Sequence, residues 1–129
     1  MDKILVEVSA GELLDKLSIL DIKKNKIDDP ISLKHINNEY NILKLEYDKK
    51  VKSDNKINEL YNSLKNINSK LWLIEDEKRL CEKKSDFGDN FIKLSRDVHF
   101  LNDKRAKLKL EINNYTGSNI LEVKKYTSY

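Results

Sequence analysis

The 129-residue sequence contains few of the side chains that metal and catalytic sites use most. It has one cysteine and two histidines, and neither histidine follows a glutamate at the three-residue spacing of helical di-iron sites. We therefore expect no metal site, no cofactor and no intrachain disulfide. The single Cys81 continues an apolar stripe, so it is interpreted as a small core residue and not as a nucleophile.

Long hydrophobic runs and a dominant charge are also missing. No apolar stretch approaches the roughly 20 residues that span a membrane, and Glu7 interrupts the apolar start, so no secretion signal is expected. The net charge is only +3, and three of the 25 basic residues are arginine. Because arginine is the side chain that binds phosphate through two parallel hydrogen bonds, nucleic acid is not an expected partner. We expect one cytoplasmic domain over residues 1–129, since a lone cysteine suits a reducing compartment.

Glycine and proline are scarce as well, with three and one residues, so few positions interrupt a helix. Ser9 and Glu12 have the S-x-x-E spacing of a helix N-terminus, which predicts a first helix over residues 10–27. Asp29 followed by Pro30 favours the start of a second helix, because proline fits the first helical turn.

The later helix boundaries carry weaker signals. Ser53, Asp54 and Asn55 are capping and turn residues and predict a break between the second and third helices. The alternative is one continuous helix of about fifty residues, because the apolar spacing passes through the break. Asp86 is expected to cap the fourth helix, and Gly117 is expected to end it.

Apolar residues recur every three or four positions in the two longest segments. They are Ile57, Leu60, Leu64, Ile67, Leu71, Ile74 and Cys81 in one segment, and Phe87, Phe91, Leu94, Val98, Leu101, Leu108 and Ile112 in the other. This spacing is typical of coiled-coil-like packing. It predicts an all-α fold, an antiparallel four-helix bundle dominated by a long hairpin of the third and fourth helices. Residues 3–8 and 120–126 alternate like short strands, so the termini are candidates for a two-stranded β pair.

One charged residue interrupts the apolar seam of the fourth helix. Arg105 lies where a leucine belongs, and a charge there must pair, reach solvent or bind a ligand. The carboxylates that short loops would bring near it are Glu12, Asp15, Asp21 and Glu39. Two hypotheses remain open. The first is a buried ion pair that fixes helix register, and the second is a polar pocket for a small anion or a sugar-like ligand.

A second group of residues lies on the third helix. Trp72 is the only tryptophan and lies beside the main apolar stripe, and Glu75, Asp76 and Arg79 follow it. Glu75 and Arg79 are four residues apart, the spacing of an ordinary surface ion pair. Trp72 either packs on a neighbouring helix or marks a partner surface. These four residues are therefore candidates for a protein-partner surface.

Several motifs taken together resemble a family of short bacterial and phage proteins. They are the segment 11–20 (GELLDKLSIL), Leu71-Trp72 with Glu75-Asp76, Asp86-Phe87-Gly88 with Phe91-Ile92, and Asn102-Asp103 with Arg105-Ala106. The family is an uncharacterised domain of unknown function. The resemblance implies an independent short protein from a bacterium or a phage, and it implies no catalytic residue or cofactor.

No motif specifies a reaction, so we expect a non-enzymatic interaction or scaffold module. A third helix of about thirty residues is about 45 Å long. It is longer than the first helix, so part of the apolar seam of the long hairpin has no partner within the chain. A second copy is expected to cover that seam in a homodimer, unless the tail over residues 120–126 covers it. The alternative function is a small helical enzyme or ligand-binding protein with its pocket around Arg105, and the family resemblance implies a link to cell-surface polysaccharide metabolism.

Overall fold

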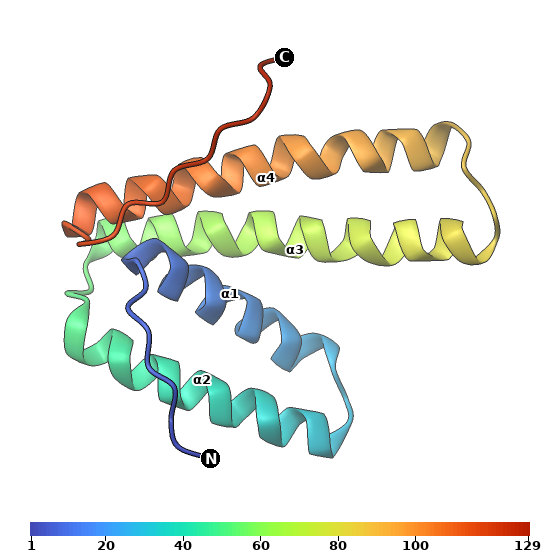
Figure 1. The fold of residues 1–129 in the computed structure, drawn as a ribbon. Coiled ribbons are helices and arrows are strands. Elements are labelled where there is room, and N and C mark those ends of the chain that lie inside the picture. The colour runs from blue at the N-terminus through green and yellow to red at the C-terminus, as the bar shows by residue number, and fades with distance from the viewer.

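The computed structural model describes all 129 residues and contains four helices and no strand (Figure 1). The helices are α1 (Ala10–Lys26), α2 (Pro30–Lys50), α3 (Asn55–Lys83) and α4 (Asp89–Thr116). The all-α class predicted from the apolar spacing is confirmed. None of the four helices combines the length and the hydropathy of a membrane span.

Side-chain caps begin the first three helices. The Ser9 hydroxyl oxygen accepts the backbone N–H of Glu12 at 3.0 Å, as the S-x-x-E spacing predicts. Asp29 caps α2 and Asp54 caps α3 in the same way, each accepting a first-turn N–H. Because Asp54 starts a new helix after the break at residues 51–54, the alternative of one continuous helix through this region is wrong.

The two ends of α4 differ in how well the sequence predicts them. The Asp86 carboxylate accepts the N–H of Gly88 at 3.2 Å within the preceding turn, so it does not cap the helix, and that prediction is wrong. Helix α4 begins at Asp89 without a side-chain cap. At the other end Gly117 has a left-handed conformation with φ 68°, which glycine adopts without strain, and it ends the helix as predicted.

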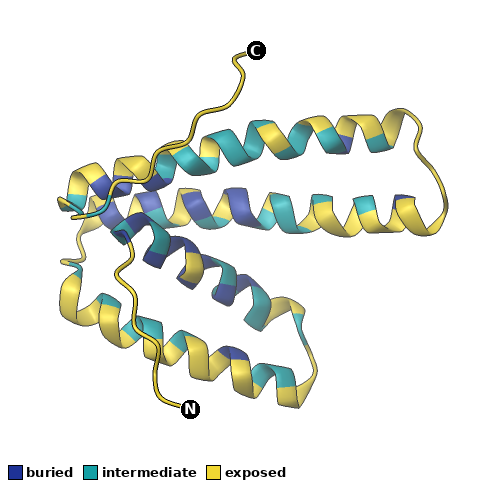
Figure 2. Cartoon of the chain, in the orientation of Figure 1, coloured by how far each residue is buried: buried dark blue, intermediate teal, exposed yellow.

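The helices form two hairpins of unequal length (Figure 1). Helix α4 runs back beside α3, and α1 and α2 lie against one end of this long hairpin. Helix α1 packs against all three other helices, whereas α2 closely approaches only α1. A cluster of buried apolar residues lies at the end where α1 packs (Figure 2): Leu14, Ile57, Leu60, Leu64 and Ile112. Burial of such side chains contributes about 1.5–3 kcal/mol each.

The terminal segments do not form the β pair that their alternation allows, so this part of the fold prediction is wrong. Their apolar side chains have no face to cover, and Ile4, Leu5 and Val6 are exposed. The two ends leave the start of α1 in different directions (Figure 1). Side chains alone join them at their bases, where the Asn119 amide donates to the Glu7 carboxylate at 2.7 Å.

Candidate functional site

The Asp15 carboxylate of α1 joins three helices. Its side chain is only 2% exposed. Oδ1 accepts a hydrogen bond from Asn68 Nδ2 of α3 at 2.8 Å and another from Arg105 Nε of α4 at 3.0 Å. Oδ2 accepts a third from Arg105 Nη2, so the guanidinium holds the carboxylate through two parallel hydrogen bonds.

A buried lysine extends these contacts to the C-terminal tail, residues 118–129. Lys109 Nζ lies 2.6 Å from Glu12 Oε2, 3.8 Å from Asp15 Oδ2 and 3.7 Å from Glu122 Oε2. The Ser9 hydroxyl donates to the other Glu122 oxygen at 2.8 Å. We refer to the connected set Glu12, Asp15, Asn68, Arg105, Lys109 and Glu122 as the Asp15 cluster. Through it the tail is attached to the first turn of α1.

The Asp15 cluster holds its central carboxyl group ionised. Burial alone would raise the pKa of Asp15, but hydrogen bonds from Arg105 and Asn68 and the positive charges of Arg105 and Lys109 lower it below its ordinary value. The hydrogen bond to Asp15 raises the pKa of Arg105 in turn. No fully buried side-chain nitrogen or oxygen lacks a partner. A proton-transfer catalyst needs a pKa near the working pH, so Asp15 is better suited to holding helices than to chemistry.

A glycine allows α1 and α4 to touch at the Asp15 cluster. The Gly11 N–H donates to Asn113 Oδ1 at 2.6 Å, and a Cβ on Gly11 would lie 2.5 Å from the Lys109 carbonyl oxygen. Any side chain here would force the helices apart. Arg105, Lys109 and Asn113 follow one another at four-residue intervals, so one face of α4 carries all three against α1.

A cavity of about 350 Å³ opens beside Arg105, between α1, α3 and α4. We call it the Trp72 cavity; its lining residues are Ile19, Ile22, Asn68, Leu71, Trp72, Glu75, Asp76, Arg79 and Arg105. The cavity thus brings together two groups of residues that the sequence leaves separate, the four from Trp72 to Arg79 and the seam residue Arg105. Trp72 is partly buried, and Arg79 is mostly exposed with Glu75 at 4.0 Å.

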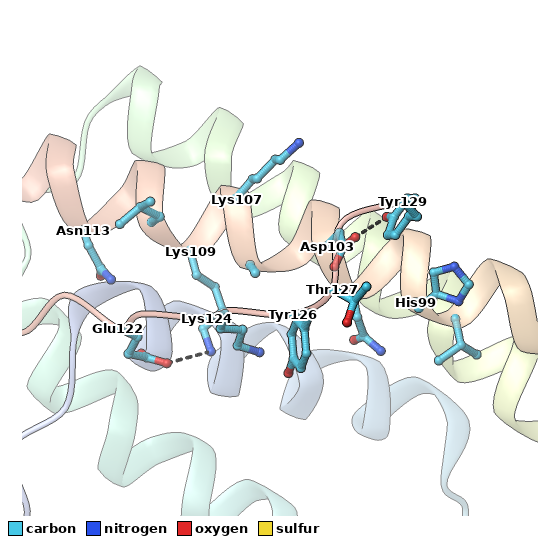
Figure 3. Close-up of a pocket in the computed structure, with 14 residues that line it drawn as sticks. His99, Asp103, Lys107, Lys109, Asn113, Glu122, Lys124, Tyr126, Thr127 and Tyr129 are labelled. Carbon is cyan, nitrogen blue, oxygen red and sulfur yellow. Dashed lines mark hydrogen bonds and ion pairs between the residues drawn. The ribbon is translucent and has the colours of Figure 1, made fainter.

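A larger cavity, about 850 Å³, lies between α4 and the C-terminal tail (Figure 3). Lys109 and Glu122 lie at one end of it. At the other end the Tyr129 hydroxyl donates to Asp103, and the Tyr129 ring packs against His99 with centroids 5.4 Å apart. One wall is the exposed tail itself. The Trp72 cavity has walls from three helices and is therefore the better-defined candidate site.

The carboxylates proposed as partners of Arg105 have different positions. Asp15 bonds Arg105 directly, and Glu12 lies within reach of Lys109. Asp21 accepts a hydrogen bond from the Tyr61 hydroxyl instead. Glu39 is exposed on α2 and takes part in no ion pair, because α2 approaches α1 alone and does not reach α4.

Sequence reasoning missed three members of the Asp15 cluster. Asn68 follows Ile67 on the apolar stripe of α3, which is a detectable signal because a buried amide needs partners. Lys109 is detectable from its four-residue spacing after Arg105. Glu122 has no such signal, because the tail has no periodicity that fixes its path.

Comparisons with known proteins give one match. No curated protein and no solved structure matches the chain significantly. The family of unknown function DUF6165 matches residues 4–129, nearly the whole of the four-helix fold described above. The chain therefore belongs to this family of unknown function.

Proposed function

We propose that the protein is a helical interaction module that forms a homodimer through the outer face of α3. The observation that supports this is an exposed apolar series that α1 does not cover. Leu73 and Leu80 lie seven residues apart on α3 and are 51% and 49% exposed, and Phe87, 51% exposed, lies in the loop after α3 ends at Lys83. A seven-residue apolar spacing is the pattern by which helices pair along a seam. We refer to these three residues as the outer stripe.

The rest of the chain leaves about half of each outer-stripe side chain exposed. Helix α1 has 17 residues and α3 has 29, so α3 is about 18 Å longer at 1.5 Å per residue. Figure 2 shows the part of the long hairpin beyond α1 as mostly exposed. The tail residues Leu121, Val123 and Tyr126 are themselves exposed, and the tail lies beside α4 and not along the outer stripe. Exposed apolar surface of this kind usually marks an interface.

The charges beside the outer stripe fit a second copy of the same chain. If two α3 helices pair in opposite directions about Leu80, Leu73 lies opposite the end of the partner helix, where the loop that carries Phe87 of the partner subunit begins. The same pairing sets exposed Glu77 against Lys83 of the partner subunit. A two-fold interface must be complementary to itself, and these pairings are. A stable dimer buries about 1,200 Å² or more, so a single stripe of this length supports a weak dimer.

Light scattering tests the dimer directly. At high micromolar concentration the mass should approach twice the 15.2 kDa of the chain and should fall on dilution. Leu80→Glu places two like charges at the two-fold axis and should give a monomer. The matched control is Leu121→Glu, because Leu121 is equally exposed at 51% but lies in the tail, and this variant should still dimerise.

A charge exchange tests the direction of pairing. Glu77→Lys should weaken the dimer by placing lysines opposite each other, and adding Lys83→Glu should restore it. A chain that stays monomeric at every concentration would exclude the proposal. Dimerisation that Leu80→Glu leaves unchanged would show that another surface is used.

We further propose that the helices form an antiparallel bundle, as the short connections between them favour, and that the protein acts in the cytoplasm of a bacterial or phage-infected cell. A lone buried cysteine suits a reducing compartment. An enzyme is the less favoured alternative, because Asp15, the most buried carboxylate of the Asp15 cluster, is fully paired.

A further inference from the structure

We infer that the Trp72 cavity binds a small neutral molecule carrying several hydroxyl groups on a ring, such as a monosaccharide. This binding site is separate from the outer stripe and does not depend on self-association. Its volume of about 350 Å³ lies at the small end of the range for ligand pockets, about 300–1,000 Å³. The inference is built from the floor of the cavity, its walls and its charge.

The floor offers one fixed acceptor and one fixed donor. Asn68 is only 5% exposed, and its Nδ2 donates to Asp15 and to Ser18, at 2.8 Å each. Its Oδ1 accepts no hydrogen bond. Because no fully buried polar atom in the structure lacks a partner, this oxygen keeps some exposed surface, and Asn68 lines the cavity. Arg105 uses Nε and Nη2 on Asp15, and its side chain is 30% exposed, which leaves Nη1 as a donor.

The walls combine an aromatic ring with polar groups of both kinds. Trp72 and three aliphatic side chains supply apolar surface. Glu75 and Asp76 accept hydrogen bonds, and Arg79 donates them. A pyranose ring has a face of C–H groups and a rim of hydroxyls that both donate and accept. Its C–H face suits the indole, and its rim suits the mixed polar groups.

The charge of the cavity favours a neutral ligand over an ion. Arg79 and Arg105 are balanced by Glu75 and Asp76. An anion would therefore meet the two carboxylates of the lining, and a cation would meet its two guanidinium groups. The structure thus supports the sugar-like ligand of the pocket hypothesis and disfavours the small anion.

The only tryptophan of the chain lies in this cavity, so its fluorescence reports on the site without a label. We would titrate the protein with the methyl glycosides of glucose, galactose, mannose and N-acetylglucosamine, and with sodium phosphate. At least one glycoside should change the emission saturably with a Kd of about 1 mM, a typical value for a small polar ligand. Phosphate should produce no saturable change.

Two exposed arginines of the long hairpin provide a matched pair of variants. Arg79 lines the cavity and Arg96 does not. Arg79→Ala should weaken glycoside binding about fivefold or more through the lost charged hydrogen bond, and Arg96→Ala should leave it unchanged. Helical circular dichroism should match the unmodified protein for both variants. Asp76→Asn provides a second cavity variant that keeps the side-chain volume.

Three results would overturn the inference. One is the absence of a saturable response to any glycoside up to about 100 mM, far above the expected Kd. Another is saturable binding of phosphate alone. The third is equal weakening by Arg79→Ala and Arg96→Ala. Repeating the titration on Leu80→Glu separates the two proposals, because the monomer should bind the glycoside as the unmodified protein does.

Discussion

The Asp15 carboxylate is almost completely buried and yet ionised, which makes it the most constrained group in the chain. Removing a carboxylate from water costs several kcal/mol unless donors replace the lost hydration. Asn68 and Arg105 supply three such donors from two other helices. Each donor reaches Asp15 only when α1, α3 and α4 are in one register. The cluster therefore selects one arrangement of helices whose apolar seams would also pack when shifted.

Replacing Arg105 should reveal the strength of this constraint. Arg105→Ala leaves a cavity and a buried acid short of two hydrogen bonds, and should lower the free energy of unfolding by about 3 kcal/mol. Arg105→Leu fills the space with apolar volume and should cost about 1–2 kcal/mol less. Urea unfolding followed by circular dichroism measures both variants. Equal losses for alanine and leucine would mean that volume at this position contributes little.

Acid should weaken the fold through Asp15. Its folded-state pKa lies below the ordinary 3.8, so near and below pH 3.8 the unfolded chain binds more protons than the folded chain does. The contribution of Asp15 is therefore complete above about pH 5 and is lost as the pH falls through the folded-state pKa. The difference in unfolding free energy between the unmodified protein and Asp15→Asn should shrink between pH 6 and pH 3.

The control for this pH effect is Asp28→Asn, because Asp28 is exposed and forms no ion pair in the structure. The difference between this variant and the unmodified protein should be small at both pH values. A difference for Asp15→Asn that stays constant with pH would contradict the ionised, stabilised carboxylate.

Part of the candidate site can be found from the sequence, for a physical reason. Arg105 breaks an apolar pattern, and a charge on a seam requires a partner, which leads to acids on neighbouring helices such as Asp15. The apolar periodicity shows which face of a helix is buried, but it does not show at which residues two helices meet. That alignment depends on the close approach at Gly11, which only the structure reveals. The path of Glu122 likewise depends on a tail with no periodic pattern.

The C-terminal tail is the element whose role the sequence leaves least determined. Removing residues 118–129 takes away the Ser118 hydroxyl that accepts the Ala10 N–H, and the Glu122 carboxylate that contacts Ser9 and Lys109. The loss of these hydrogen bonds should lower the free energy of unfolding by about 1–2 kcal/mol. Amide hydrogen exchange should show the effect concentrated in the first turn of α1.

A shorter deletion is the control for the tail. Removing only residues 126–129 takes away Tyr129 and its exposed contacts to Asp103 and His99, while Glu122 stays. This change should cost less than about 0.5 kcal/mol. If both deletions destabilise equally, the aromatic end and not Glu122 holds the tail.

Among the features of the helices and the terminal segments, the helix boundaries were the most predictable, because a cap depends only on residues close together in the sequence. Ser9, Asp29 and Asp54 each accept an N–H in the next turn, a contact set by three residues of sequence. Strands depend on a partner and on a face to cover, which local alternation at residues 3–8 does not supply. Asp86 shows the same limit of local prediction. Its carboxylate could cap α4 or accept an N–H within the preceding turn, and the local sequence does not distinguish the two.

At the scale of the whole molecule, the two ends of the long hairpin have different roles. At one end α1, the Asp15 cluster and the buried leucines hold the helices in register. At the other end α3 has no internal partner on its outer face. The Trp72 cavity lies where these two parts meet, beside Arg105. In our proposals a ligand in the cavity and a second copy on the outer stripe therefore occupy neighbouring surfaces of α3.

The partners of Asp15 also determine when the chain can fold during synthesis. Its hydrogen bonds come from residues 53 and 90 positions later, and Glu122 follows Ser9 by 113 positions. At about 5–20 residues per second, the ribosome makes Arg105 about 5–18 s after Asp15. Until then α1 and α2 can pair only loosely, because burying Asp15 without donors is unfavourable. Helix α1 is therefore made first but is among the last helices to reach its final environment. Asp15 and its surroundings stay hydrated until α4 has left the ribosome.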